Sequence, residues 1–214
     1  MTLLYRFLHL AFRGLAQVLS KERSVQGLEN IPLSGPVIFI SNHISYWDPT
    51  TLFAFVPRQI YFMSKAEMFR YRVLGWLFRA LHVFAVERDS PDLNAIHRAL
   101  AILQRGDPIA LYPQGSRAPL AKDQTRRAKG GVLIIAERSR APIVPVAITG
   151  LETLFITCFP WIGRPAVSVT FGQPFKFEEL LAQSKLTQDR DSLLEALMAR
   201  VMDLLPASGH APKT

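Results

Sequence analysis

The sequence predicts a single α/β domain of the kind in which helices flank a mixed central sheet, with an amphipathic helix at the N-terminus. Short apolar runs rich in β-branched and aromatic residues alternate along the chain with longer segments of helical periodicity, which is the pattern of α/β folds. The 214 residues are 49% hydrophobic, so the chain is long and apolar enough for one domain with a sizeable core.

Strands and helices are expected in alternation. The strands are short apolar runs, at 37–40, 60–63, 83–86, 109–112, 143–147 and 166–171. The helices are segments whose apolar residues recur every three or four positions, at 2–20, 49–56, 66–81, 91–104, 129–138 and 189–204. Pro49 suits the first position of its helix, and Asp48 before it suits the N-cap. The expected division is an N-terminal helix (1–24), a core domain (25–205) and a frayed tail (206–214).

The first of these helices is amphipathic. Leucines and phenylalanines recur on one side of it, while Arg6, Arg13 and Gln17 fall largely on the other side. A helix of this kind at a chain end either packs on the domain core or lies in a membrane interface. This segment alone favours neither interpretation.

The charge of the chain is unevenly distributed. The formal net charge is +8, and residues 1–140 contain 19 Lys and Arg against 10 Asp and Glu, whereas residues 141–214 contain 6 against 7. A basic excess favours an anionic partner, which is nucleic acid, a membrane surface or a phosphorylated substrate. Residues 69–79 interleave Arg with Phe, Tyr and Trp, a composition that suits a lipid headgroup region and also nucleic acid.

Several classes of protein are excluded by composition. Cys158 is the only cysteine, so the chain forms neither an internal disulfide nor a cysteine zinc site. Charged residues interrupt the apolar stretches before they reach the roughly 18–20 residues that span a bilayer. The apolar residues near the N-terminus are dispersed rather than gathered as in a secretory signal. Any membrane contact is therefore expected to be peripheral.

Polar side chains follow three of the expected strands, at the point where each strand ends. They are Asn42, His43 and Asp48 after the first strand, Glu87, Arg88 and Asp89 after the third, and Gln114, Gly115, Ser116 and Arg117 after the fourth. Ligand sites of open α/β sheets form beyond the carboxyl ends of the strands. A histidine, a carboxylate and arginines at such ends predict an active site for an anionic substrate.

His43 and Asp48 have the chemistry of a general base and its orienting partner. If His43 lies in the loop and Asp48 opens the next helix, the carboxylate accepts the Nδ1 proton and leaves Nε2 as a free base. The chain has no Gly-x-Ser-x-Gly nucleophile motif. A His–Asp pair without its own serine favours a base that acts on a substrate hydroxyl.

Four blocks of the sequence resemble, in order and spacing, those of the glycerolipid acyltransferase family, which includes 1-acylglycerol-3-phosphate acyltransferases. Residues 42–48 resemble the family's NHxxxxD block, and residues 86–88 resemble its second block, which ends in arginine. Residues 112–118, YPQGSRA, resemble the third block, usually FPEGTRS. Residues 143–146 resemble the fourth, an apolar segment around a proline. The resemblance covers about residues 25–175.

The resemblance implies a role for each site residue. His43 would be the general base toward the acceptor hydroxyl, with Asp48 as its partner. Arg88 and Arg117 would bind the acceptor's phosphate, because guanidinium forks match phosphate oxygens. The other implied substrate-binding residues are Gln114, Gly115, Ser116 and Lys129, of which the glycine would let the loop backbone approach the ligand closely.

The resemblance also implies substrates and surroundings. The donor would be an acyl thioester, either acyl-CoA or acyl carrier protein, and no metal or redox cofactor is implied. The acceptor would be a lysophospholipid, first of all 1-acylglycerol-3-phosphate, which gives phosphatidic acid. The enzyme is expected as a peripheral protein on anionic lipid at the cytoplasmic face of a membrane, without nucleic acid as a partner.

One departure from the family pattern matters, whereas Tyr112 for Phe and Ser116 for Thr are milder. Gln114 stands where the third block usually has an acid, so the hydrogen-bonding shape is kept and the negative charge is lost. The acceptor therefore stays open between 1-acylglycerol-3-phosphate and another lysolipid or polar lipid. Two other classes also stay open, a membrane- or nucleic-acid-binding protein with a decayed site and an esterase acting through Ser45 or Ser116. The intact His43 and Asp48 count against decay.

Overall fold

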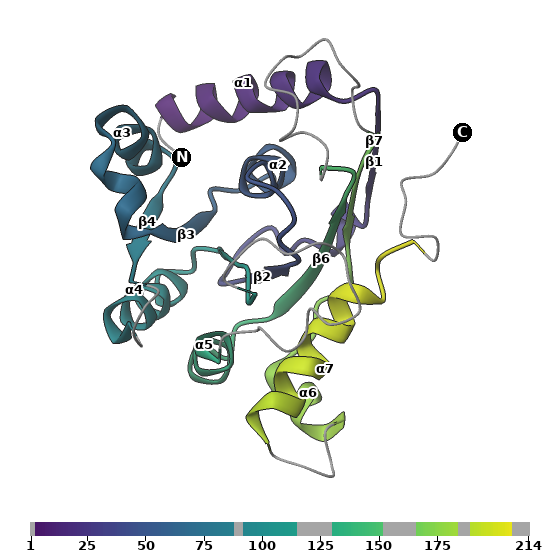
Figure 1. Ribbon diagram of the computed structural model, residues 1–214. Helices are drawn as coiled ribbons and strands as arrows, with labels where there is room; N and C mark the ends of the chain where they lie inside the picture. The colour runs from purple at the N-terminus through teal and green to yellow at the C-terminus, as the bar shows by residue number, and fades with distance from the viewer. Residues whose placement is uncertain (1–2, 88–91, 115–129, 152–165, 184–188, 207–214) are drawn as a thin grey trace.

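A central sheet with helices on both faces organises the computed structural model (Figure 1). The structure describes residues 3–87, 92–114, 130–151, 166–183 and 189–206. Within these ranges, none of the helices has the length and apolar character needed to cross a bilayer.

The sheet has seven strands in the order β1-β7-β6-β2-β5-β3-β4. Neighbouring strands run parallel except for β6 and β7, which are antiparallel, so the expected mixed sheet is confirmed. The strands are β1 (Glu22–Gln26), β2 (Ile38–Ser41), β3 (Tyr61–Lys65), β4 (Val83–Val86), β5 (Ile109–Leu111), β6 (Ile143–Thr149) and β7 (Ala166–Phe171). The central β2 is fully buried, which explains its uninterrupted apolar run.

The helices form one layer on each face of the sheet. They are α1 (Leu3–Leu19), α2 (Asp48–Phe55), α3 (Arg72–Ala80), α4 (Leu93–Gln104), α5 (Gly131–Ser139), α6 (Phe177–Gln183) and α7 (Arg190–Met202). Side chains of α1, α2 and α3 pack with Val37 and Phe39 in one core. Side chains of α4 to α7 pack with Ile38 and Ile40 in the other. The alternation of β2 residues between the two cores is the period of two expected of a strand.

Two expectations about individual elements were wrong. The chain over 66–81 is not one helix, because a short 3-10 helix, η2 (Ala66–Arg70), is separated from α3 by extended backbone at Tyr71. Gly75 allows the two pieces to pack closely, since a Cβ at this position would come within 2.7 Å of the Phe69 carbonyl oxygen. Residues 22–24, assigned to the N-terminal helical segment, belong to β1. This edge strand has too few apolar residues to show a strand pattern, and its pairing with β7 defines it.

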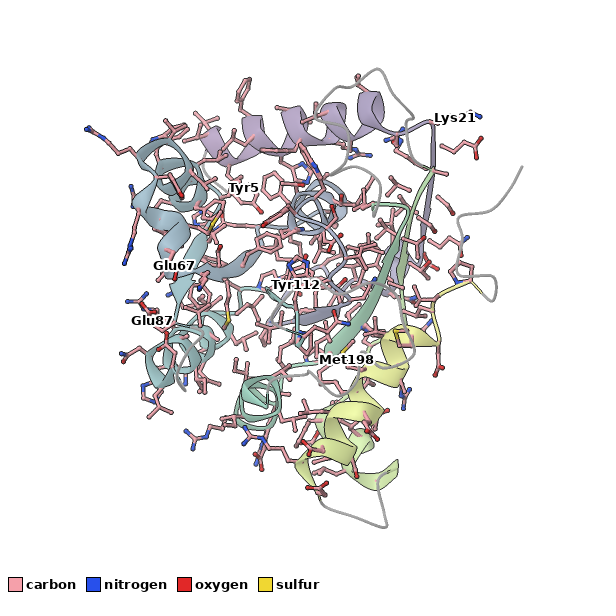
Figure 2. All side chains as sticks on the ribbon, viewed as in Figure 1. Tyr5, Lys21, Glu67, Glu87, Tyr112 and Met198 are labelled. Atoms are coloured by element: carbon pink, nitrogen blue, oxygen red, sulfur yellow. The ribbon has the colours of Figure 1, made fainter. Side chains whose placement is uncertain are left out.

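Helix α1 is apolar on two faces. Its inner face packs on α2, where Tyr5 is fully buried, stacks edge-on with Phe53 at 5.0 Å between centroids, and accepts a 2.9 Å hydrogen bond from the Ile60 amide. Figure 2 shows Tyr5 between α1 and the body of the domain. The outer face leaves Phe7 and Leu10 each 68% exposed. The helix therefore packs on the core and also presents an apolar surface, so the two interpretations are not exclusive.

Candidate active site

The site begins where β2 leaves the sheet. Ser41 is the last residue of β2 and pairs with Val146 of β6. The next residue, Asn42, is fully buried, and its side-chain amide bonds both backbone groups of Ile148. Nδ2 donates to the Ile148 carbonyl at 2.7 Å, and Oδ1 accepts from the Ile148 amide at 2.8 Å. Asn42 thus fastens the chain to β6 immediately before His43. The sequence predicts no individual role for Asn42, and the available signal was its place directly after a buried strand.

His43 and Asp48 form the hydrogen-bonded pair that the sequence predicts. The Nδ1 of His43 lies 2.7 Å from Oδ2 of Asp48. The same oxygen accepts hydrogen bonds from the amides of Ile44 at 2.7 Å and Ser45 at 2.8 Å. Asp48 is fully buried, whereas 12% of the His43 side chain is exposed. Because Oδ2 is the acceptor, Nδ1 is the donor and Nε2 is left with its lone pair.

Asp48 does not serve as the helix cap that its position suggests. Trp47 is the N-cap of α2, and Asp48 is the first helical residue. The Asp48 carboxylate turns back to the loop before the helix, where it meets the amides of residues 44 and 45. One carboxylate therefore shapes the loop and orients the imidazole, which a helix cap would not do.

Gln114 holds the backbone of the histidine. The side chain is 3% exposed, and its Oε1 accepts a 2.8 Å hydrogen bond from the His43 amide. This contact is to the loop that holds His43, and the predicted contact of Gln114 with a substrate stays a prediction. A carboxylate oxygen at this position would accept the same bond, so the departure from the family pattern preserves this contact.

Tyr112 lies against the imidazole. The two ring centroids are 4.6 Å apart at an interplanar angle of 33°, and Figure 2 shows Tyr112 in the interior of the molecule. Burial raises the pKa of Tyr112 well above its usual value, and the charge of Asp48 raises that pKa further. Neither the Tyr112 hydroxyl nor Oδ1 of Asp48 has a hydrogen-bond partner among the described residues. In the sequence, Tyr112 is only a mild departure from the phenylalanine that is usual in the family.

The remaining predicted site residues lie outside the described residues, namely Arg88, Gly115, Ser116, Arg117 and Lys129. The strands that precede them are described. β5 is the immediate neighbour of β2, and β4 is separated from β2 by β5 and β3. These four strands are parallel, so their carboxyl ends lie at the sheet edge that also holds His43.

Two further observations bear on the chemistry. Ser45, considered as an esterase nucleophile, is 2% exposed, and its hydroxyl oxygen accepts a hydrogen bond from the Trp47 amide at 3.3 Å. Its Oγ therefore forms a hydrogen bond within the loop and is not accessible to a substrate. In the part of the chain that the structure describes, His, Cys, Asp and Glu side chains do not gather in threes as a metal site would require.

The chain is similar in sequence to several named acyltransferases. The chain shares 32% identity over 145 residues with a 1-acyl-sn-glycerol-3-phosphate acyltransferase of Streptococcus pneumoniae, covering 67% of this chain and 51% of that protein. It shares 29% identity over 202 residues with the protein of that name from Bacillus subtilis, covering 91% and 90%. A lyso-ornithine lipid O-acyltransferase of Pseudomonas aeruginosa is 30% identical over 115 residues, covering 53% and 43%.

The fold is also found in a solved structure. The crystal structure of a 1-acyl-sn-glycerophosphate acyltransferase from Thermotoga maritima matches with a TM-score of 0.67 at 20% identity, covering 98% of this chain and 83% of that one. The model of the acyltransferase family matches residues 22–149, which include β2, the His43–Asp48 pair and Gln114. With more than half of its length matched by that family model, the chain belongs to the acyltransferase family.

Proposed function

We propose that this acyltransferase moves a fatty acyl group from an acyl thioester, acyl-CoA or acyl carrier protein, to the hydroxyl of a lysophospholipid. The first candidate for the acceptor is 1-acylglycerol-3-phosphate, which would give phosphatidic acid. One observation carries the proposal, the 2.7 Å contact between His43 Nδ1 and buried Asp48, which leaves Nε2 on a partly exposed ring. The names of the streptococcal and Bacillus relatives support the choice of acceptor.

The proposed reaction is a direct attack without a covalent enzyme intermediate. Nε2 of His43 takes the proton of the acceptor hydroxyl while the oxygen bonds to the thioester carbonyl carbon. The C–S bond then breaks, and the thiolate leaves with the proton that His43 returns. Asp48 stabilises the imidazolium in between, which is the role of a buried orienting carboxylate. Gln114 and Tyr112 hold the backbone and ring of His43.

The phosphate contacts of the acceptor are proposed for the residues outside the described ranges. Arg88 and Arg117 would bind the phosphate oxygens bidentately, with Lys129 adding charge. Gly115 and Ser116 would bring loop amides close to the ligand. We expect Arg117→Ala to raise the KM of the acceptor far more than that of the donor, and Arg117→Lys to restore it incompletely because the fork is lost. Equal effects on both substrates would contradict this assignment.

A second acceptor class is favoured by a specific residue and a specific relative. Gln114 lacks the negative charge that the third block usually supplies, and a relative of similar identity is named for lyso-ornithine lipid. Another lysolipid or polar-lipid acceptor is therefore the alternative. A panel of lysolipids assayed with one labelled thioester decides between them, because the preferred acceptor shows the highest kcat/KM.

The same assay tests the reaction class. We expect the label to appear in diacyl lipid, and His43→Ala to reduce turnover by about 10²–10⁴-fold with the fold intact. Release of free fatty acid without acyl transfer would show an esterase instead. Lipid binding without any turnover would show a binding protein.

We further propose that the enzyme works as a peripheral protein on the cytoplasmic face of a membrane. Exposed apolar side chains stand on α1 and on α3, where Val73 is 81% and Trp76 is 55% exposed. Arg6 and Arg13 lie on α1, and Arg72 and Arg79 lie on α3. Apolar insertion together with attraction of about 1 kcal/mol per basic residue favours anionic bilayers.

A further inference from the structure

A concavity of about 330 Å³ lies at the amino ends of the parallel strands, whereas His43 lies at their carboxyl ends. It is open to solvent and is formed between the end of α3, one face of α4 and the first residues of β3 and β4. The side chains that matter here are Tyr61, Arg79, His82, Phe84, Arg98 and Arg105. Because β2, β5, β3 and β4 are parallel, the starts of β3 and β4 lie at the amino edge of the sheet. The concavity is therefore separate from the active site.

The walls of the concavity are basic. Three guanidinium groups border it, one from α3 and two from the α4 segment. Among the described residues, Arg105 has a carboxylate partner, Asp107 at 3.5 Å, while Arg79 and Arg98 form no ion pair. The Arg105 guanidinium also lies 5.8 Å from the centroid of the Tyr61 ring. Planar, positively charged forks around one hollow are suited to phosphate oxygens.

His82, which also lines the concavity, has an unusual backbone conformation and a ring nitrogen without a described partner. Its φ is +57°, a conformation uncommon for a residue other than glycine. Its ring lies 5.4 Å from Tyr5 and 5.0 Å from Tyr61 between centroids. Its Nε2 is buried and has no hydrogen-bond partner among the described residues. Burial lowers the pKa of His82, and the charge of Asp107 partly opposes this shift.

We propose that this concavity binds a phosphate group, carried by an anionic lipid or by a soluble phosphorylated ligand, at a site distinct from the acceptor site. The guanidinium groups of Arg79, Arg98 and Arg105 supply the charge, and the His82 ring lines the same hollow. The concavity adjoins the exposed apolar side chains of α3, because Arg79 lies one turn after Trp76. A bound headgroup would thus sit at the rim of the proposed membrane surface.

The test uses two double variants of the full chain that each remove two positive charges. Arg98→Gln/Arg105→Gln alters the concavity, and Arg138→Gln/Lys176→Gln alters exposed residues of α5 and of the segment before α6, on the other face of the sheet from α1. The ring resonances of His82 are followed by NMR while inorganic phosphate or glycerol 3-phosphate is added. Sedimentation with phosphatidylglycerol and with phosphatidylcholine vesicles measures lipid binding.

We expect at least one probe to bind with an affinity that falls 10-fold or more in Arg98→Gln/Arg105→Gln and less than 2-fold in the control. A response to the soluble probes identifies a soluble phosphorylated ligand, and a response to phosphatidylglycerol alone identifies a lipid headgroup. Acyl transfer to a dispersed acceptor should stay within 2-fold of wild type, since the site is away from His43. No response to any probe, or equal losses in the two double variants, would overturn the proposal. This outcome is independent of whether the proposed acyl transfer is correct.

Discussion

Replacement of Asp48 by Asn removes one charge and nearly no volume from the centre of the site. The Asn carbonyl oxygen can take the place of Oδ2, where it would accept from His43 Nδ1 and from the amides of Ile44 and Ser45. The Asn amide then occupies the Oδ1 position, which has no described partner. Because the wild-type oxygen at this position is also unpaired, we expect the variant to stay folded and the loss to appear in catalysis.

The catalytic effect follows from the lost charge. An imidazolium and a carboxylate whose charge centres are roughly 4 Å apart attract by about 4 kcal/mol at an effective dielectric of 20. Without that attraction the transition state, in which His43 holds the proton, is less stable by a similar amount. We therefore expect Asp48→Asn to lower kcat by about 10²–10³-fold, since 1.4 kcal/mol corresponds to tenfold.

The assay is steady-state acyl transfer from a labelled thioester to dispersed lysolipid, with circular dichroism as the check on folding. A double-mutant cycle with His43→Ala tests whether Asp48 acts through the imidazole. In the His43→Ala background, Asp48→Asn should change kcat less than about threefold. A folded Asp48→Asn enzyme with kcat within a few fold of wild type, or two losses that multiply, would refute the proposed partnership.

Three further outcomes are expected. Tyr112→Phe removes a buried hydroxyl with no described partner, so thermal unfolding should show a free energy of unfolding that is higher by about 1 kcal/mol. The kcat should stay within a few fold of wild type because the stacked ring remains. A loss of stability would reveal a partner for the hydroxyl. Asn42→Ala leaves two buried backbone groups of β6 unpaired, which should lower the free energy of unfolding in denaturant by about 2–6 kcal/mol and lower kcat. Native stability would show that the loop does not depend on this anchor. Phe7→Gln/Leu10→Gln should weaken sedimentation with anionic vesicles at least 10-fold without a change in Tm. The control is Leu33→Gln, at a residue outside α1 that is 77% exposed, and matching losses in both would remove the case for an α1 membrane surface.

The two faces of α1 change how its membrane role is tested. Deleting the helix would also remove Tyr5, which is fully buried and accepts a hydrogen bond from the Ile60 amide. A truncated chain would lose core packing as well as the exposed apolar surface, and its vesicle binding would not separate the two. Substitutions limited to the outer face change the surface alone.

Much of the fold and the His43–Asp48 contact could be predicted because the signals are local. Each of the six expected strands is present, because a short apolar run between turn residues is typical of a buried strand. The His43–Asp48 contact spans five residues and follows from a strand, a loop and a helix start in succession.

Long-range contacts were decided by the tertiary structure alone. Gln114 meets the His43 amide across 71 positions, and Asn42 meets Ile148 across 106. β1 becomes a strand by pairing with β7, about 140 residues away, in spite of its polar composition. Tyr5 belongs to the core because α1 lies on α2 and covers Phe53. The pattern of a sequence reports which side chains avoid water, whereas the choice of a partner for each buried polar group depends on which strands become neighbours in the folded sheet.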